Sequence, residues 1–498
     1  MADLFLRMLA AGSGVQATPE TDYDQRLQLL TAELRQAPPQ KLVADIPGRG
    51  SLLQALDPAQ HSLSYLFVLL AHFHDSQQAT KKSFPDTFQA GSELWSQSMA
   101  LLKKFDPIQV RYAGHEFKEL ISIAARSAEI ASRPLLAVYP IREAILRLDP
   151  QGSTFTSFHS DFLRLCLRAR SYLPAVAVLE KDICHFPTII DMPFLRRSQK
   201  PLTDESQSSS LYITASSGLV GKLNYRHYLE YFLFGGMIYL GLKKWNQALH
   251  FLSIVISAPT ISSVSLIMVE AYKKWTIACL LEHGKLLPLP RTTTSTAKSA
   301  YKALAKPYDA LAEVFTSGSL SRLQAEISVG QQVWHADNNS GLVLQVPPAF
   351  NKFSVCALER TFAALSIPDI TAKIDVDNEN AERFITSLVI TDRLRACLVQ
   401  PSQRSLPTIL RFILPLSSSN VASEAKFEKS LEVQKDRLRS LLHNLQDTDI
   451  KIALGRDYVD SMRKAPKRKD TDDGDGMIPA GTLGGELGLD EDMMGDLH

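Results

Sequence analysis

Apolar residues recur at helical spacing along almost the whole stretch from 21 to 330, and no other feature constrains the fold as strongly. The period begins at Leu27, Leu30 and Leu34 and continues through YLFVLLAHF (65–73) and ELISIAARSAEIA (119–131). The interruptions are short and contain Pro, Gly or Ser. Helices of about 12–20 residues joined by short turns favour stacked helical pairs, so residues 1–330 are predicted to form a helical-repeat solenoid.

One window indicates how the helices of this solenoid pack. In YFLFGGMIYLGLKKWNQALHFL, the residues Gly236, Tyr239, Trp245 and Ala248 have the spacing of a tetratricopeptide-like helical hairpin. The small residues allow two antiparallel helices to approach closely, and the aromatic residues fill the wedge between them. A second partial copy lies in 171–187, but no strict 34-residue period runs through the chain, so the repeats are degenerate.

Composition excludes several classes of protein. The chain has 54 Lys and Arg against 53 Asp and Glu, which rules out a polybasic nucleic-acid coat. No apolar run approaches the ~20 residues that cross a bilayer. The 5 cysteines lie singly in apolar segments, so we expect a reducing compartment, cytoplasm and nucleus, with no cysteine-based zinc site and no cofactor.

The texture of the sequence changes at two places. Residues 198–220 are rich in Ser and Thr and are predicted to form a long exposed loop inside the solenoid. After residue 330, two short helices are expected in ALERTFAALSIPDITAKI, followed by a helix with an apolar face and by β-rich segments at 393–399 and 408–414. Helices followed by a β-hairpin predict a winged helix over 331–415.

The C-terminal part begins with an amphipathic helix. The segment 421–463 is predicted to form bundle helices, and 424–445 carries an apolar stripe with a mixed-charge outer face. The tail then divides into a basic stretch, KAPKRK, and an acidic stretch from 470, so 464–498 is expected to be disordered in isolation.

Three motifs suggest catalysis and none satisfies its chemistry. His72 and His74, with Ser83 and Asp86 downstream, resemble the zinc site of MPN-type isopeptidases. That site requires seven residues between the second His and the Ser, whereas 75–82 has eight, and it requires a strand where the sequence predicts a helix. On a helix, residues two apart point about 200° apart and cannot share a metal, so we expect solvent-facing histidines at a helix end.

The other two motifs are also structural. In Cys184-His185 the two residues are adjacent and cannot form a thiolate–imidazole pair without a special turn. Gly235-Gly236 lacks the phosphate-loop pattern and lies in the middle of a predicted helix, where close packing explains it. The sequence therefore predicts a protein that is not an enzyme.

The winged helix raises the alternative of nucleic-acid binding. Its candidate recognition helix, 380–395, carries three Arg residues against Glu382 and Asp392, and the wing adds Arg404 and Arg411. DNA-reading helices concentrate cations because phosphate contacts supply most of the affinity. This weak excess favours protein contact over nucleic acid.

A helical solenoid followed by a winged helix resembles the PCI family, which is shared by the proteasome lid, the COP-nine signalosome and translation initiation factor three. LSIPDITAKI (365–374), ENAERFITSLVITDRLRACLV (379–399) and TILRFIL (408–414) carry the resemblance. The wing departs from the family pattern because 400–407 replaces the usual Ile-Asp and Gly of its turn.

Within the PCI family, residues 227–290 are most similar to the signalosome subunit 3 family, and KPYDALAEVF (306–315) and DNNSGLV (337–343) extend the match. This resemblance implies a non-catalytic scaffold. The signalosome removes the ubiquitin-like modifier Nedd8 from cullin-RING ligases, and its zinc isopeptidase lies in another subunit.

The predicted partners are therefore other PCI subunits and the MPN-type subunits of the same complex, bound through the wing and the C-terminal helix. No small-molecule substrate and no membrane contact is expected. A proteasome-lid subunit, or a PCI subunit in mRNA export or translation initiation with nucleic-acid contact, remains the alternative. The candidate partner-binding residues are Leu398, Leu410, Phe412, Phe427, Leu431, Leu438, Leu441, Leu442 and Leu445.

Overall fold

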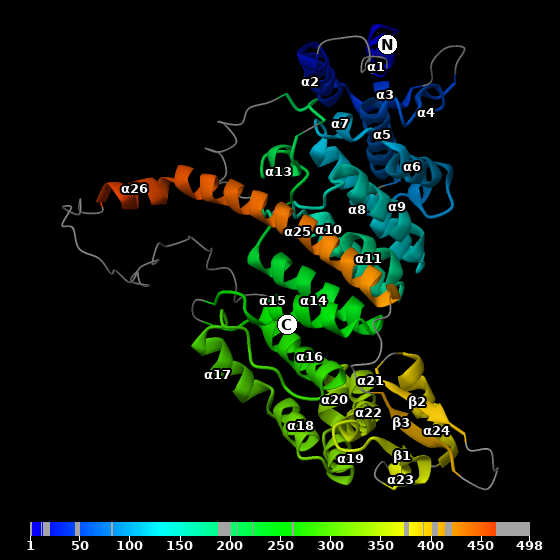
Figure 1. Ribbon diagram of the computed structural model, residues 1–498. Coiled ribbons are helices and arrows are strands. Elements are labelled where there is room, and N and C mark those ends of the chain that lie inside the picture. Colours follow the sequence, from blue (N-terminus) through cyan, green and yellow to red (C-terminus); the bar gives the residue numbers. More distant parts are fainter. Residues whose placement is uncertain are drawn as a thin grey trace.

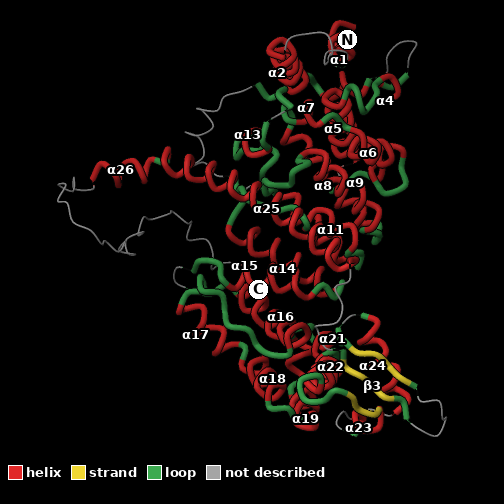
Figure 2. The backbone as a smooth tube through the Cα atoms, in the orientation of Figure 1, coloured by secondary structure: helices red, strands yellow, loops and turns green. Residues whose placement is uncertain are grey.

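The computed structural model is an elongated stack of helices with a small sheet at one end (Figures 1 and 2). It describes residues 2–10, 12, 20–44, 50–80, 83–187, 201–205, 207–221, 223–260, 263–372, 378–391, 393–400, 407–413 and 421–464. The predicted disordered tail, apart from residue 464, lies outside these ranges.

The N-terminal part of the stack packs around helix α5, whose apolar residues face neighbours on nearly every side. Buried residues run along this helix from Ser62 to Ala71 without a polar stripe, which is typical of a helix in the middle of a core. The elements of this part are α1 (Ala2–Ala10), α2 (Glu20–Gln36), α3 (Pro39–Val43), α4 (Leu52–Ala55), α5 (Ser62–Thr80), η1 (Asp86–Phe88), α6 (Glu93–Lys104), α7 (Pro107–Val110), α8 (Gly114–Ile130) and α9 (Leu135–Leu148).

The central repeats form the predicted tetratricopeptide-like hairpins. Helices α14 (Tyr225–Gly241) and α15 (Trp245–Ile256) approach so closely that a Cβ on Gly235 would lie 2.6 Å from Phe251, and one on Gly236 would lie 2.8 Å from Leu252. Glycine is required here for close approach rather than for backbone freedom. The other central helices are α10 (Ser157–Arg168), α11 (Leu173–Leu179) and α16 (Leu266–His283).

Although the sequences of the repeats are only loosely similar, four helices end in the same backbone conformation: α8, α10, α14 and α16. Each of these helices is followed by a residue in the left-handed region: Ser132, Arg170, Lys243 and Gly284, with φ of 54°, 51°, 57° and 68°. After the first three, a backbone N–H bonds to a carbonyl five residues earlier, as Lys244 does to Tyr239 at 2.9 Å. This is the Schellman ending of a helix.

The Ser-rich segment is not an exposed loop where the structure describes it, so that prediction is wrong for residues 201–205 and 207–220. The segment crosses the stack and includes the short helix α13 (Ser209–Tyr212). Ser209 and Tyr212 are buried, and the hydroxyl of Tyr212 donates to the carbonyl of Leu148 at 2.8 Å. The backbone of the segment packs directly against Gly114, where a Cβ would lie 2.3 Å from the carbonyl oxygen of Ser217. Short serines allow this close contact, whereas composition alone suggests solvent exposure.

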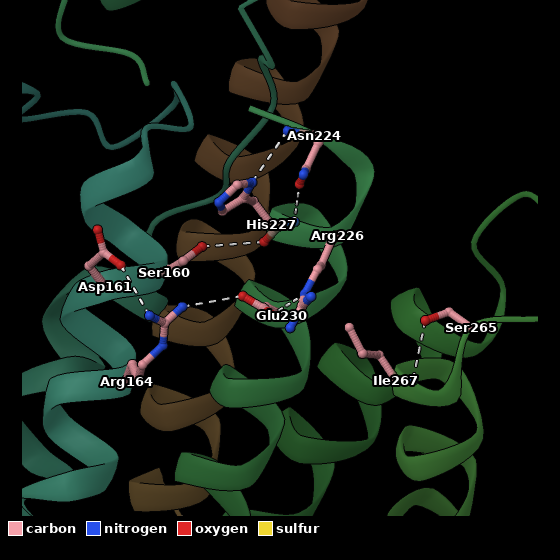
Figure 3. Close-up of polar contacts among 9 residues, drawn as sticks. All are labelled: Ser160, Asp161, Arg164, Asn224, Arg226, His227, Glu230, Ser265 and Ile267. Atoms are coloured by element: carbon pink, nitrogen blue, oxygen red, sulfur yellow. Dashed lines mark hydrogen bonds and ion pairs between the residues drawn. The ribbon is translucent and has the colours of Figure 1, made fainter. Parts of the chain in front are cut away.

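Helices α10 and α14 contact each other directly. Figure 3 shows polar contacts at this place: Arg164 of α10 lies 3.3 Å from Glu230 of α14 and 3.6 Å from Asp161 of its own helix. Glu230 also pairs with Arg226 at 2.8 Å. The capping box at Asn224 and His227 begins α14 at the same place.

The last part of the solenoid passes into the winged helix through a shared helix. Phe350 of α22 belongs to the solenoid core, whereas Val355 of the same helix belongs to the separate core of the winged helix. The helices of this part are α17 (Ser295–Leu304), α18 (Lys306–Thr316), α19 (Leu320–Val329), α20 (Gln331–Ala336), α21 (Ser340–Val343) and α22 (Val346–Leu358).

The winged helix contains a strand that the sequence interpretation missed. Residues 364–366 were expected in a helix, but they form β1 (Ala364–Ser366) and begin an antiparallel sheet of order β1-β3-β2. Its other elements are α23 (Ile367–Thr371), α24 (Asn378–Ile390), β2 (Ala396–Val399) and β3 (Ile409–Phe412). As predicted, Ala381, Ile385 and Leu388 face the core, and Phe384 packs against it.

The chain then forms a long C-terminal helix. Helix α25 (Val421–Leu454) extends well beyond the predicted 424–445 and is followed by α26 (Arg456–Lys464). In Figure 1, α25 is the orange helix that crosses the middle of the stack and ends well to one side of it. The fold is therefore mainly α: a helical-repeat solenoid, a winged helix and a projecting C-terminal helix.

Candidate functional site

The apolar stripe of α25 is open to solvent. Its six predicted contact residues expose between 37% and 66% of their surface, and none of the described side chains of the helix is buried. Exposed leucines in such a row are unusual on a protein that works alone. The stripe consists of Phe427, Leu431, Leu438, Leu441, Leu442 and Leu445.

The wing residues lie in a different setting. Leu410 is 0% exposed, at the centre of the winged-helix core, and Leu398 and Phe412 are half-buried against that core. The prediction that the side chain of Leu410 contacts a partner is therefore wrong. The physical reason is its position on β3, where the apolar residues of a central strand face the helices that cover the sheet.

Strand order also changes which backbone groups are open. The wing was predicted to contact partners, but its strand β3 lies between β1 and β2. Leu410 pairs with Leu365 on one side and with Leu398 on the other. The central strand therefore has no free edge, and β2 is one of the two outer strands.

In the pairing of β2 with β3, the backbone groups of Leu398 are free to bond to another strand. The N–H of Ile413 donates to the carbonyl of Arg395 at 2.9 Å, and antiparallel bonding alternates along a ladder, so Cys397 and Val399 bond to β3. The N–H and C=O of Leu398 consequently point outward from the sheet. Leu398 keeps a place at a candidate contact surface through its backbone, while its side chain turns toward the core.

A buried polar cluster lies in the last part of the solenoid, between α16, α18 and the residues that follow α20. Lys274 of α16 is 6% exposed and donates to Asn339 at 2.8 Å and to Glu270. Asn339 donates to the hydroxyl of Tyr308 at 2.8 Å, and that hydroxyl donates to Asp337 at 2.8 Å. Segments 270–274, 306–315 and 337–343, which carried the family resemblance, thus meet in one place.

This cluster is structural rather than catalytic in its chemistry. Burial and the neighbouring Asp337 raise the pKa of Tyr308, although its bond from Asn339 acts in the opposite direction. Every charged member has an opposite charge or an amide beside it, which is how a buried network avoids unpaired groups. Lys273 completes the cluster with an ion pair to Asp337 at 2.7 Å.

The winged helix is tied to the solenoid through the region weighed above as a candidate recognition helix. Helix α24 ends at Ile390, and Arg393 pairs with Glu282 of α16 at 3.3 Å. Glu382, on α24 itself, accepts from the hydroxyl of Thr408 at 3.3 Å. One of the three arginines of the candidate recognition helix is therefore engaged with the solenoid, which leaves Arg383 and Arg395 on the surface.

The residues of the histidine motif contact different partners and do not form one site. His74 lies on α5 with its side chain 40% exposed, and its Nε2 is 2.8 Å from Glu119 of α8. Ser83 accepts from Arg126, and Asp86 accepts from Gln89 at 2.7 Å. Within the part of the chain that the structure describes, no group of three or more His, Cys, Asp or Glu side chains is arranged to hold a metal.

The Cys184-His185 pair belongs to an extended segment. The N–H groups of both residues donate to the carbonyl of Ser153, at 2.9 and 3.0 Å, and the carbonyl of His185 accepts from Phe155 at 2.9 Å. Burial, followed by the charge of Asp182, raises the pKa of the Cys184 thiol. A raised pKa is the opposite of what a nucleophilic cysteine requires.

The solenoid, the winged helix and the projecting C-terminal helix together define a PCI-type subunit of a multiprotein complex. The family described as COP9 signalosome complex subunit 3, N-terminal helical repeats, matches residues 30–297. A protein of Emericella nidulans named COP9 signalosome complex subunit 3 is 40% identical over 95% of both chains. One of the same name from Drosophila melanogaster is 27% identical over 70% of this chain and 73% of its own length. The chain belongs to the COP9 signalosome complex subunit 3 family.

Family membership agrees with the similarity found in residues 227–290 and selects the signalosome branch over the proteasome lid. No helix among the described residues has the length and apolar character needed to span a membrane.

Proposed function

We propose that the chain is a non-catalytic scaffold subunit of the COP9 signalosome, in the cytoplasm and nucleus. Its role is to hold other PCI and MPN-type subunits of the complex that removes Nedd8 from cullin-RING ligases. The observation that carries this proposal is the solvent-exposed apolar stripe of α25, on a chain of the subunit 3 family.

The stripe supports an assembly role because of its energetics. Burying one leucine side chain contributes ~1.5–3 kcal/mol. Several leucines buried together exceed the cost of ordering the side chains around them, so a bundle with the C-terminal helices of partner subunits is favourable.

Deletion of residues 421–498 tests this assignment when the chain is co-expressed with the other subunits. The truncated chain should stay folded and soluble, because the described side chains of α25 belong to neither apolar core, and it should no longer enter the complex. Full stoichiometry in the purified complex would contradict the proposal, as would aggregation of the truncated chain.

Substitutions give a sharper version of the same experiment. Leu438→Asp with Leu442→Asp places two charges in the stripe, whereas Lys429→Gln with Arg439→Gln makes the same net change of charge on the same helix outside it. The first pair should abolish co-purification and the second should retain most of it. Equal losses would show that net charge, and not the stripe, determines assembly.

The outer strand β2 is the second proposed contact, through addition of a partner strand to its free edge. Leu398→Pro removes an outward N–H and should weaken partner capture while the winged helix stays folded. Leu410→Pro is the matched comparison: it breaks the bond between β3 and β1 and should unfold the winged helix. Unchanged capture by the Leu398→Pro variant would remove β2 from the interface.

The non-catalytic assignment has its own test. The purified chain should not release Nedd8 from a conjugated cullin, and elemental analysis should find less than stoichiometric zinc. Stoichiometric zinc that is lost in a His74→Ala variant would overturn the assignment.

A further inference from the structure

The C-terminal helix contacts the solenoid with one polar face, which lies away from its apolar stripe. Arg437 pairs with Asp182 at 2.7 Å, and the Nζ of Lys451 lies 3.1 Å from the Nδ1 of His185. Between them, Asn444 hydrogen-bonds to the side chain of Cys184. We call Arg437, Asn444 and Lys451 the clasp, and residues 182–185 its seat.

Because of their spacing, the three clasp residues lie on one side of α25. They are seven residues apart, and positions at this interval repeat on one side of a helix with a drift of only about 20°. With 3.6 residues per turn, the middle of the clasp lies about 110° around α25 from the middle of the apolar stripe. A partner can therefore pack on the stripe while the clasp remains in its seat.

The seat belongs to the repeats on either side of the inserted segment. Asp182, Cys184 and His185 follow α11, and the segment is fixed to residues 153–155 by backbone bonds. His250 of α15 lies close enough to feel both charges of the ion pair: burial and Arg437 lower its pKa, and Asp182 raises it. Two repeats thus contribute to one binding surface for α25.

We propose that the clasp holds α25 on the 182–185 seat and presents its apolar stripe to partner subunits in a fixed orientation. The part that concerns partners rests on the proposed function, whereas the clasp itself does not. A helix that is already ordered and oriented loses less conformational freedom on binding, so partner capture is faster and tighter. The clasp is weak, because Arg437 and Asp182 have side chains 54% and 41% exposed and are screened by salt.

The alkylation rate of Cys184 shows directly whether the clasp is closed. Alkylation of the free chain, with each cysteine quantified by mass spectrometry, should be severalfold faster at Cys184 in an Arg437→Glu variant. Loss of the arginine charge alone would slow alkylation, because that charge lowers the pKa of the thiol. A faster reaction therefore shows that the side chain of Cys184 has become more exposed. The exposed Cys397 is the internal control and should react at an unchanged rate.

Two further variants make this result specific. Arg439→Glu alters a nearby cation that pairs with Asp436 of α25 itself, so it should leave the alkylation of Cys184 unchanged. The exchanged pair Arg437→Asp with Asp182→Arg should restore slow alkylation, and salt at about 1 M, where the screening length is ~3 Å, should imitate Arg437→Glu. Equal rates at Cys184 in all variants would overturn the clasp.

The second measurement concerns partners. Capture of the chain by the remaining co-purified signalosome subunits should be severalfold slower for Arg437→Glu, normal for Arg439→Glu and restored by the exchanged pair. Faster capture by Arg437→Glu would show that the clasp obstructs assembly and would overturn presentation of the stripe. If even the unaltered chain is not captured, the proposed function fails, while the alkylation result still decides the clasp.

Discussion

Helices α16 and α25 both contain leucines and charged residues, yet α16 is mostly buried and α25 is exposed. Twelve of the 18 residues of α16 are buried, and they include Lys274 and Thr276. In the 34-residue α25, none of the described side chains is buried. The difference lies in neighbours: α16 is enclosed by α15, α18 and α22, whereas α25 meets the solenoid only through polar side chains among the contacts described. Amphipathic sequence alone therefore does not distinguish a core helix from an interface helix.

The largest expected effect concerns the buried charge of α16. Lys274→Ala removes the buried cation from Asn339 and from Glu270, which keeps only Lys273 at 3.9 Å, and breaking a buried pair in this way costs about 3–5 kcal/mol. Arg439→Ala on α25 should cost almost nothing, because its ion pair is exposed. Unfolding in urea measures both. Similar midpoints for the two variants would contradict the comparison.

Apolar truncation should separate the two regions next. Leu252 of α15 is fully buried, so Leu252→Ala removes packed methyl groups and should cost about 2–5 kcal/mol. Leu438→Ala on α25 should change the stability of the free chain by less than about 0.5 kcal/mol. If Leu438→Ala lowers the urea midpoint as much as Leu252→Ala, the stripe is part of the core.

A third difference depends on pH. Burial lowers the pKa of His159 on α10 to about 4, against about 6.5 in an unfolded chain. The unfolded state binds more protons between these values, so stability contributed by neutral His159 is complete above pH 6.5. It falls with decreasing pH by about 1.4 kcal/mol per unit down to pH 4.

The measurement is the pH dependence of the urea midpoint, compared with that of a His159→Gln variant. The slope between pH 6.5 and 4 should be smaller in this variant because the glutamine does not titrate. Ser440→Gln on the exposed α25 serves as the control and should leave the slope unchanged, because neither side chain titrates. Equal slopes for all three proteins would exclude His159 as the group responsible.

The smallest effect has opposite signs in the two regions. Lys243 has a φ of 57°, where a side chain is strained, so Lys243→Gly should stabilise the solenoid by about 0.5–1 kcal/mol. Ser440→Gly within α25 should instead reduce helix stability by a similar amount. Thermal unfolding should resolve the first, and circular dichroism of the helical signal the second. A destabilising Lys243→Gly would contradict the strained turn.

The helical solenoid was predictable because it depends on local information. The apolar period of 65–73 and 119–131 indicates helices, and the pair Gly235-Gly236 indicates where two of them pack. The strand β1 was not predictable from its three residues. It forms because β3 supplies hydrogen-bond partners from about 45 residues further along the chain, and a strand of this length has no stability alone.

The same reasoning explains the candidate contact residues. The sequence located the α25 stripe correctly as a row of apolar residues, because a helical face depends only on spacing. It could not distinguish Leu410 from Leu398, since both lie in short apolar strands. Strand order decided that one is enclosed and that the other has an outward-facing backbone.

The helical-repeat class, the amphipathic C-terminal helix and the family resemblance could be recognised from the sequence, because all three follow from local periodicity and short motifs. Long-range packing was needed to show that the Ser-rich segment is packed against the stack, that β3 is a central strand, and that α25 meets residues 182–185 with its polar face. The physical reason is that these features depend on contacts between residues far apart in the chain. Such contacts are fixed by which surfaces remain uncovered once the local elements have packed.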